Sequence, residues 1–242
     1  MKEKIPFTSG LERNEALLVL LWLPMHIWLL PMLLQALAPG LDTGSINLLY
    51  FALSVLFLAL VSRRFLRRDF DPLCDRPGRV LGEVVLSYLI LMGCNLIAGV
   101  LLYFLLPETS NPNNAAISMA VTEQNYPKMR AAIVLLAPIA EELLFRAGVF
   151  GVMRHRSRVA AYVVSVLLFG LLHVWQYVAV DPRYWVYLLQ YIAPGILLAR
   201  VYERCNTIWA SMALHAVINF NALNAMMVLQ EMEEMLRAQG ML

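Results

Sequence analysis

The sequence predicts an all-α, polytopic membrane protein, and both its composition and the length of its apolar runs support this class. Of the 242 residues, 60% are hydrophobic and 15% are charged, whereas soluble domains carry about 45–50% apolar and about 25% charged residues. The mean hydropathy is +0.65. So few charges could not cover the surface of a soluble enzyme. The net charge of only +2 gives no strong basic field, so we expect no nucleic-acid partner.

Seven apolar runs are long enough, or nearly long enough, to cross a bilayer. A hydrocarbon core about 30 Å thick requires about 20 apolar residues in a helix. Prolines and glycines mark the breaks, such as Pro39-Gly40 after the first run. We predict one integral membrane domain over 1–242, with about seven membrane helices, or eight if a further segment crosses. The predicted spans are about 16–38, 46–62, 80–106, 131–153, 159–180, 184–201 and 207–229.

The first run is predicted to be a retained helix rather than a cleaved signal peptide. Basic residues precede it and Ala36-Leu37-Ala38 ends it, as in a signal sequence. Its length of about 23 residues exceeds the about 7–15 residues of a signal-peptide core. The polar segments 63–79 and 108–126 are expected to be loops between spans.

Basic residues gather in alternate breaks and predict the orientation, because Lys and Arg are enriched on the cytoplasmic side. One set of segments holds 14 of the 19 basic residues, the other set holds four, and Arg146 lies inside a span. We therefore expect a cytoplasmic N-terminus in an inner or plasma membrane. The richer set comprises the N-terminus with Lys2, Lys4 and Arg13, the 63–79 and 154–158 segments, and Arg200 with Arg204.

The fourth span carries charged residues away from its ends. Glu141, Glu142 and Arg146 lie within it, and a charge near the bilayer centre costs about 2.5–3.5 kcal/mol on insertion scales. Glu142 and Arg146 are four residues apart, so they can pair on one helix face. Glu141 projects from a different face and needs a partner from another helix.

Two histidines in later spans are candidates for that partner. His173 lies in the fifth span, and His215 lies in the seventh, one turn before Asn219. A rise of about 1.5 Å per residue places both histidines and Glu141 in the middle half of the membrane. A single intramembrane histidine is typical of helix packing, and we interpret His26 in this way. Two histidines, an amide and an unpaired carboxylate at one depth indicate a reactive site.

These residue types suit hydrolysis by an activated water molecule. A carboxylate in apolar surroundings is a stronger proton acceptor near neutral pH, and a neighbouring histidine could help to hold the water. His215 and Asn219, on one helix face, could both donate hydrogen bonds to an oxyanion. This chemistry needs no Ser or Cys nucleophile. The three cysteines form no C-x-x-C pair and suggest neither a disulfide framework nor a Cys-based zinc site.

The polar residues form three motifs in order, each within an apolar span. Together they resemble the CPBP family, which includes type II CAAX-prenyl endopeptidases and the bacteriocin-processing (Abi) proteins. The resemblance covers about 131–225, which we predict to be the catalytic helices. One small departure is that Ala147 stands where a glycine often follows the motif arginine. The motifs are Glu141-Glu142-x-x-x-Arg146, Phe169-x-x-x-His173 and His215-x-x-x-Asn219.

The resemblance implies an intramembrane glutamate endopeptidase that acts without a metal or other cofactor. Glu141 would be the general base and would activate water together with His173, while His215 and Asn219 would form the oxyanion site. The implied substrate is a membrane-associated peptide, which in the eukaryotic branch is a prenylated CAAX protein. Bacterial relatives act on other substrates or serve in bacteriocin immunity. The residues implied to support the site are Glu142, Arg146 and Phe169.

Three other interpretations stay open. Glu141, His173 and His215 could form a zinc site with an open water position, although the sequence has no H-E-x-x-H motif. Intramembrane Glu and His also occur in proton-coupled transporters, although the two halves lack matched interrupted helices. The third alternative is a non-catalytic scaffold or immunity protein of the same fold. A retinal protein is excluded because no predicted span contains lysine.

Overall fold

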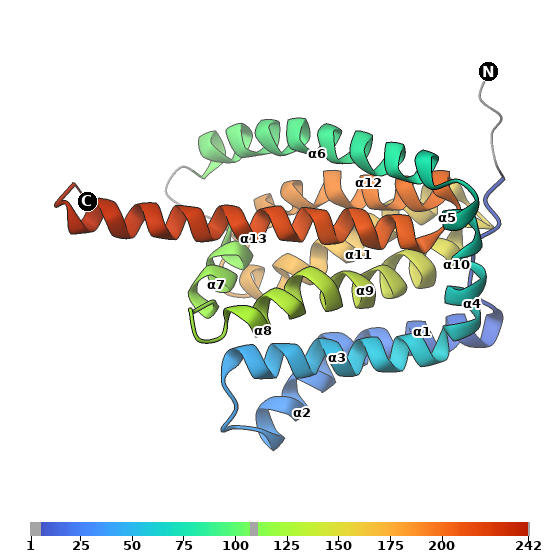
Figure 1. The fold of residues 1–242 in the computed structure, drawn as a ribbon, viewed down its shortest axis with the longest axis horizontal. Helices are drawn as coiled ribbons and strands as arrows, with labels where there is room; N and C mark the ends of the chain where they lie inside the picture. The colour runs from blue at the N-terminus through green and yellow to red at the C-terminus, as the bar shows by residue number, and fades with distance from the viewer. Residues whose placement is uncertain (1–5, 107–110, 242) are drawn as a thin grey trace.

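The apolar runs form helices that pack into a bundle in the computed structural model (Figure 1). The structure describes residues 6–106 and 111–241, so Lys2 and Lys4 lie outside the described residues. No strand occurs in these two ranges, and the predicted all-α class is confirmed. Within them, five helical segments are long and apolar enough to cross a membrane: Arg13–Leu37, Thr43–Val61, Pro77–Leu105, Arg158–Val178 and Ile208–Ala238.

The first of these segments bends through a π-helical turn next to two prolines. The Leu30 N–H donates to the Met25 carbonyl, and Pro31 has no N–H that could reach the His26 carbonyl in this register. The Tyr50 hydroxyl on the neighbouring helix donates to that carbonyl instead, at 2.9 Å. The segment consists of α1 (Arg13–Pro24), η1 (Met25–Leu29) and α2 (Leu30–Leu37).

Segment 63–79, predicted to be a loop, is largely helical. Phe65 is fully buried against the bundle, and this apolar contact stabilises a short helix. The arginines around Phe65 made the segment look like a polar loop in the sequence. The following long helix is tilted along one side of the bundle (Figure 1). The helices in this part of the chain are α3 (Thr43–Val61), α4 (Arg63–Arg68), α5 (Asp71–Asp75) and α6 (Pro77–Leu105).

Segment 108–126 also contains a helix where a loop was predicted. Residues 107–110 lie outside the described part, and α7 (Pro112–Ala120) follows them. The Asn111 side chain accepts hydrogen bonds from the N–H groups of Asn113 and Asn114, and this N-cap starts the helix.

The predicted fourth span lies at the centre of the bundle. Its residues from Glu141 to Gly151 are all buried, which explains how this span can carry charged side chains. α1 and α3 pack on one side of it, and α6 lies on the far side, next to α12 and α13 (Figure 1). The run consists of α8 (Tyr126–Arg130), η2 (Ala131–Leu136), α9 (Ala137–Glu141), η3 (Glu142–Phe150) and α10 (Gly151–Arg154), where η2 and η3 are π-helical.

The last third of the chain supplies the remaining walls of the bundle. The predicted sixth span is divided between a 3₁₀ turn and a helix of 17 residues. Because this span and the fourth are interrupted, a count of seven crossing helices stays a prediction. The elements are α11 (Arg158–Val178), η4 (Pro182–Leu188), α12 (Leu189–Cys205) and α13 (Ile208–Ala238).

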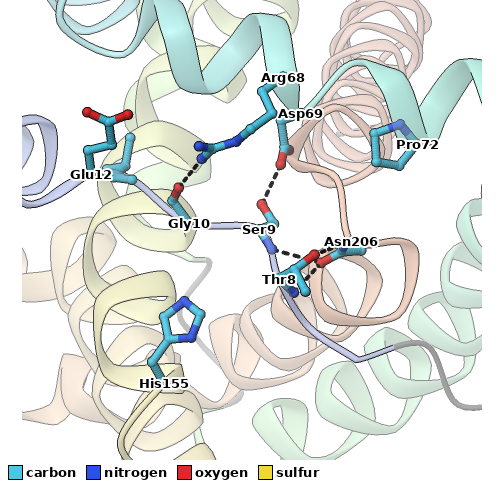
Figure 2. Close-up of a pocket in the computed structure, with 10 residues that line it drawn as sticks. Thr8, Ser9, Gly10, Glu12, Arg68, Asp69, Pro72, His155 and Asn206 are labelled. Carbon is cyan, nitrogen blue, oxygen red and sulfur yellow. Dashed lines mark hydrogen bonds between the residues drawn. The ribbon is translucent and has the colours of Figure 1, made fainter.

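The buried side chain of Asp69 connects several segments at the end of the bundle where the arginine-rich segments lie. The Ser9 hydroxyl donates to Asp69 Oδ1 at 2.5 Å, and the Ile208 N–H donates to Asp69 Oδ2. Asn206 accepts from the backbone N–H of Thr8 and of Ser9, at 2.8 and 2.9 Å (Figure 2). Burial raises the pKa of Asp69 to about 6. We call these side chains and their bonds the Asp69 cluster.

Candidate active site

Glu142 is a fully buried carboxylate whose two oxygens both have partners. Oε1 accepts from Nδ1 of His215 at 2.8 Å and lies 3.1 Å from Nη1 of Arg146. Oε2 accepts from the Ser211 hydroxyl. The predicted pairing of Glu142 with Arg146 is confirmed. His215 and Ser211 come from α13, so Glu142 joins the central helix to the last helix.

Phe169 lies between the charged pair and the two histidines. The Arg146 guanidinium carbon is 4.2 Å from the centre of the Phe169 ring, a cation–π contact. The same ring is 4.8 Å from the His173 ring and 5.7 Å from the His215 ring, measured between centroids. Arg146 is fully buried, so this aromatic face replaces part of its hydration. The structure therefore brings all three predicted supporting residues into the site.

Glu141 differs from its neighbour because one of its oxygens is unpartnered. Only 6% of Glu141 is exposed, and Oε2 makes no hydrogen bond within the described part of the chain. This oxygen lies 3.9 Å from Nε2 of His173 and 3.8 Å from Nε2 of His215. Three side chains that are distant in the sequence thus converge on one point. Unpaired buried polar atoms are rare, and they are typical of functional sites.

The hydrogen bonds of the two imidazole rings define which nitrogen faces Glu141. His173 Nδ1 lies 2.8 Å from the Phe169 carbonyl, which can only accept, so Nδ1 carries the proton. In the neutral ring, Nε2 of His173 then presents a lone pair toward Glu141. His215 Nδ1 faces the Glu142 carboxylate and is also protonated. The Tyr191 ring stacks on His173, with centroids 4.5 Å apart and planes at 24°.

A proline in the central helix positions Asn219. The Ala137 N–H donates to the Ala132 carbonyl in the π-helical pattern, so the next donor should reach Ile133. That next residue is Pro138, which has no N–H. The Ile133 carbonyl instead accepts from Nδ2 of Asn219 at 2.9 Å. Asn219 lines the cavity, and within the described residues this is the one hydrogen bond of its amide nitrogen.

These side chains open into a cavity of about 550 Å³. All four predicted catalytic residues line it, and so does Phe169. The predicted catalytic helices, 131–225, supply these residues. The first three spans also contribute, because His26, Tyr50 and Asn95 belong to the same lining.

The sequence reasoning missed several residues of the site. Ser211 precedes His215 by one helical turn, so the i, i+4 spacing could have found it. Tyr191 and Asn95 lack a comparable signal, because neither lies one helical turn from a charged residue or a histidine. His26 does bind its helix neighbours as predicted, since its Nδ1 lies 2.9 Å from the Ser54 hydroxyl, but it also reaches the cavity.

Comparison with known proteins covers the same region. Residues 124–221 match the family model described as "Type II CAAX prenyl endopeptidase Rce1-like". The resemblance to the CPBP family is confirmed. All seven residues predicted for the site lie within the Rce1-like region. Together with the five apolar helices, this match indicates a multi-pass integral membrane protein.

Two curated bacterial proteins are similar to the Rce1-like region and its surroundings. "Putative membrane peptidase YdiL" of Bacillus subtilis (strain 168) is 28% identical over 124 residues, which is 51% of this chain and 47% of that protein. "UPF0177 protein YxdF" of Lactococcus lactis subsp. lactis (strain IL1403) is 29% identical over 85 residues, 35% of this chain and 42% of that protein. The chain thus covers less than half the length of each relative. No solved structure gives a significant match.

The predicted zinc alternative requires a cluster of metal-ligating side chains. Among the described residues, no group of three or more His, Cys, Asp or Glu side chains has an arrangement that could hold a metal ion. The sequence-based zinc interpretation therefore becomes one arm of the experiment below.

Proposed function

We propose that this protein is an intramembrane endopeptidase in which Glu141 and His173 activate the attacking water. The observation that carries the proposal is the unpartnered Oε2 of Glu141, buried between two imidazole nitrogens at 3.8 and 3.9 Å. The similarity of residues 124–221 to type II CAAX prenyl endopeptidases supports the endopeptidase activity. The substrate class is a membrane-associated peptide, prenylated or not.

The distances suit a water molecule held between the carboxylate and the histidine. Both exceed the about 2.7–3.2 Å of a direct hydrogen bond, and contacts beyond about 3.5 Å are commonly bridged by water. Such a water would donate one hydrogen to Glu141 and the other to the Nε2 lone pair of His173, so its own lone pair is free to attack the carbonyl carbon. Glu141 would take the proton and pass it to the leaving amine.

His215 and Asn219 would stabilise the oxyanion of the tetrahedral intermediate. Because Nδ1 of His215 donates to Glu142, Nε2 can donate only if the ring is the imidazolium. The Glu142 carboxylate beside Nδ1 would stabilise this form of the ring. The remaining amide hydrogen of Asn219 would be the second donor.

Replacing the proposed base tests this function. Wild type and Glu141→Gln would be purified and placed in liposomes with a pool of prenylated and unprenylated peptides, and cleavage would be read by mass spectrometry. Loss of a general base should reduce the rate by roughly 10²–10⁴-fold. Glu231→Gln, on the exposed end of α13, is the matched control and should cleave like wild type.

Two results would contradict the mechanism. Full activity in Glu141→Gln would remove Glu141 from the reaction. Loss of wild-type cleavage on adding a chelator, with recovery on adding Zn²⁺, would replace metal-free activation with the zinc alternative. Cleavage of none of the peptides would favour the non-catalytic scaffold.

A further inference from the structure

The polar part of the cavity lining consists mostly of carboxamides rather than charged side chains. Eight of the residues that line it are Asn or Gln. Glu141 is the one acidic residue, and none is Lys or Arg, among the described residues of the lining. A substrate therefore meets many neutral donors and acceptors, and no Lys or Arg among the described residues of the cavity wall.

Asn95 is a polar residue on a helix that is otherwise suited to lipid. It is the one carboxamide or charged residue between Leu89 and Leu106, and an 18-residue stretch of α6 has a mean hydropathy of 2.2. Asn95 is exposed and lines the cavity, and its amide has no hydrogen-bond partner among the described residues. An unpaired polar group inside a membrane span is costly, so its presence indicates a functional role.

Gln176 provides a second carboxamide in the lining, on a different helix. It follows His173 by three residues on α11, which places both side chains on one helix face. Gln176 is exposed, lines the cavity and makes no hydrogen bond within the part of the chain that the structure describes. Two unpartnered amides from different helices thus open into the cavity that holds Glu141.

A carboxamide has the same donor and acceptor groups as a peptide bond. Asn95 and Gln176 can therefore bind the main chain of an extended peptide without reading its side-chain charges. A free C-terminal carboxylate, by contrast, requires a cation or an open helix N-terminus. The N-terminus of α7 reaches the cavity, but Asn111 already caps it. The imidazolium proposed at His215 lies against Glu141 and Glu142, and an ionised Glu141 would repel a carboxylate.

We propose, on the basis of the endopeptidase function above, that the substrate enters as an internal, uncharged and extended segment. Asn95 and Gln176 hold its main chain, and recognition needs no free C-terminal carboxylate near the cleaved bond. In this proposal the protein recognises the main chain of the substrate rather than a charged terminus.

Binding to an inactive variant tests the proposal separately from catalysis. The probe is a fluorescent peptide of about ten residues, about 33 Å when extended, made of Ala, Leu, Gly and Ser with both ends blocked. Two further forms carry either a free C-terminal carboxylate or N-methyl groups on the central amides. Fluorescence anisotropy would measure binding of each form to Glu141→Gln in detergent. Because this variant lacks the Glu141 charge, it does not repel the C-terminal carboxylate of the free-acid peptide, so the comparison favours binding of that form.

The blocked peptide should bind at least as tightly as the free acid, and N-methylation should weaken binding by about tenfold, since several hydrogen bonds are lost. Asn95→Leu and Gln176→Leu, added to Glu141→Gln, should each weaken binding by about fivefold. Asn221→Leu is the matched control. Asn221 is exposed on α13, bonds to Val217 of its own helix and does not line the cavity, so binding should be unchanged.

Three results would overturn the proposal: tenfold tighter binding of the free acid, insensitivity to both N-methylation and the two amide substitutions, or no binding of any form. Cleavage of the same peptides by wild type separates the two proposals. Binding without cleavage supports backbone recognition and contradicts the endopeptidase. Cleavage with a strong preference for the free acid supports the endopeptidase and contradicts backbone recognition.

Discussion

The Asp69 cluster and the Glu141 site each hold a buried carboxylate, but the two carboxylates are bonded differently. Asp69 is 3% exposed and Glu141 is 6% exposed. Both oxygens of Asp69 accept hydrogen bonds, and these bonds join the N-terminal residues to the start of α13. Oε2 of Glu141 has no such bond among the described residues. Burial alone therefore does not define the role of a carboxylate. Glu83 Oε2 also lacks a hydrogen bond, but it pairs with Arg200, whereas Oε2 of Glu141 has two imidazole nitrogens as its neighbours.

The same contrast occurs between adjacent residues of the central helix. Glu142 has partners on both oxygens and connects Arg146, Ser211 and His215. Glu141 faces the cavity instead. We interpret Glu142 as the residue that holds the site together and Glu141 as the residue that reacts. The predictions below test this difference, beginning with the largest expected effect.

Glu142→Gln should destabilise the protein strongly. It leaves the fully buried Arg146 without its counter-charge, and breaking a buried ion pair costs about 3–5 kcal/mol. Thermal unfolding in detergent, followed by circular dichroism, would measure the change. Glu141→Gln is the matched control and should change the free energy of unfolding by less than about 0.5 kcal/mol. Equal destabilisation by the two variants would remove the distinction between the two glutamates.

The Asp69 cluster should make stability depend on pH. Burial raises the pKa of Asp69 to about 6, above its value in the unfolded chain, so the folded state binds more protons between about pH 4 and pH 6. This stabilisation is complete below about pH 4 and is lost as the pH rises through 6, a change of at most about 3 kcal/mol. Unfolding midpoints measured from pH 4 to 7 would show the slope.

Asp69→Asn should flatten that slope because it removes the titrating group. Asp71→Asn, a change at an exposed aspartate two residues away, should leave it unchanged. Two results would show that Asp69 does not cause the pH dependence of stability. Wild-type stability could rise with pH over the same window, or Asp69→Asn could keep the wild-type dependence.

Tyr191 should have the smallest of these effects, through the position of His173. Its ring stacks on His173, and such aromatic pairs contribute about 0.5–1.5 kcal/mol beyond their buried area. Tyr191→Leu should reduce the rate of peptide cleavage by about three- to tenfold. Tyr191→Phe keeps the stack and loses only the hydroxyl contact with Asn111, so its rate should stay within about twofold of wild type. Equal rates in the two variants would exclude a positioning role for the ring.

Charged residues and histidines in apolar spans made part of this site predictable. The cost of burying Glu141, Glu142 and Arg146 in a membrane predicted a polar interior, and the structure places His173 and His215 beside them. The pairing of Glu142 with Arg146 follows from their spacing alone. The roles of these residues in catalysis remain proposals.

The remaining features depend on contacts that the sequence pattern does not contain. Pro138 predicts a disturbed helix, but only the packing of α13 shows that the freed Ile133 carbonyl binds Asn219. Phe65 within its arginine-rich segment and the cap at Asn111 similarly produce short helices where polar composition predicted loops. An unpartnered amide such as Asn95 can be recognised only after its neighbours are known.

The most direct test of the central claim measures cleavage and unfolding on the same preparation of Glu141→Gln. If Glu141 is the reactive carboxylate, cleavage of the peptide pool should fall by at least about 100-fold, while the unfolding midpoint stays at the wild-type value. Wild-type cleavage in this variant, or a midpoint lowered as far as in Glu142→Gln, would contradict the claim that the unpartnered oxygen is reserved for catalysis.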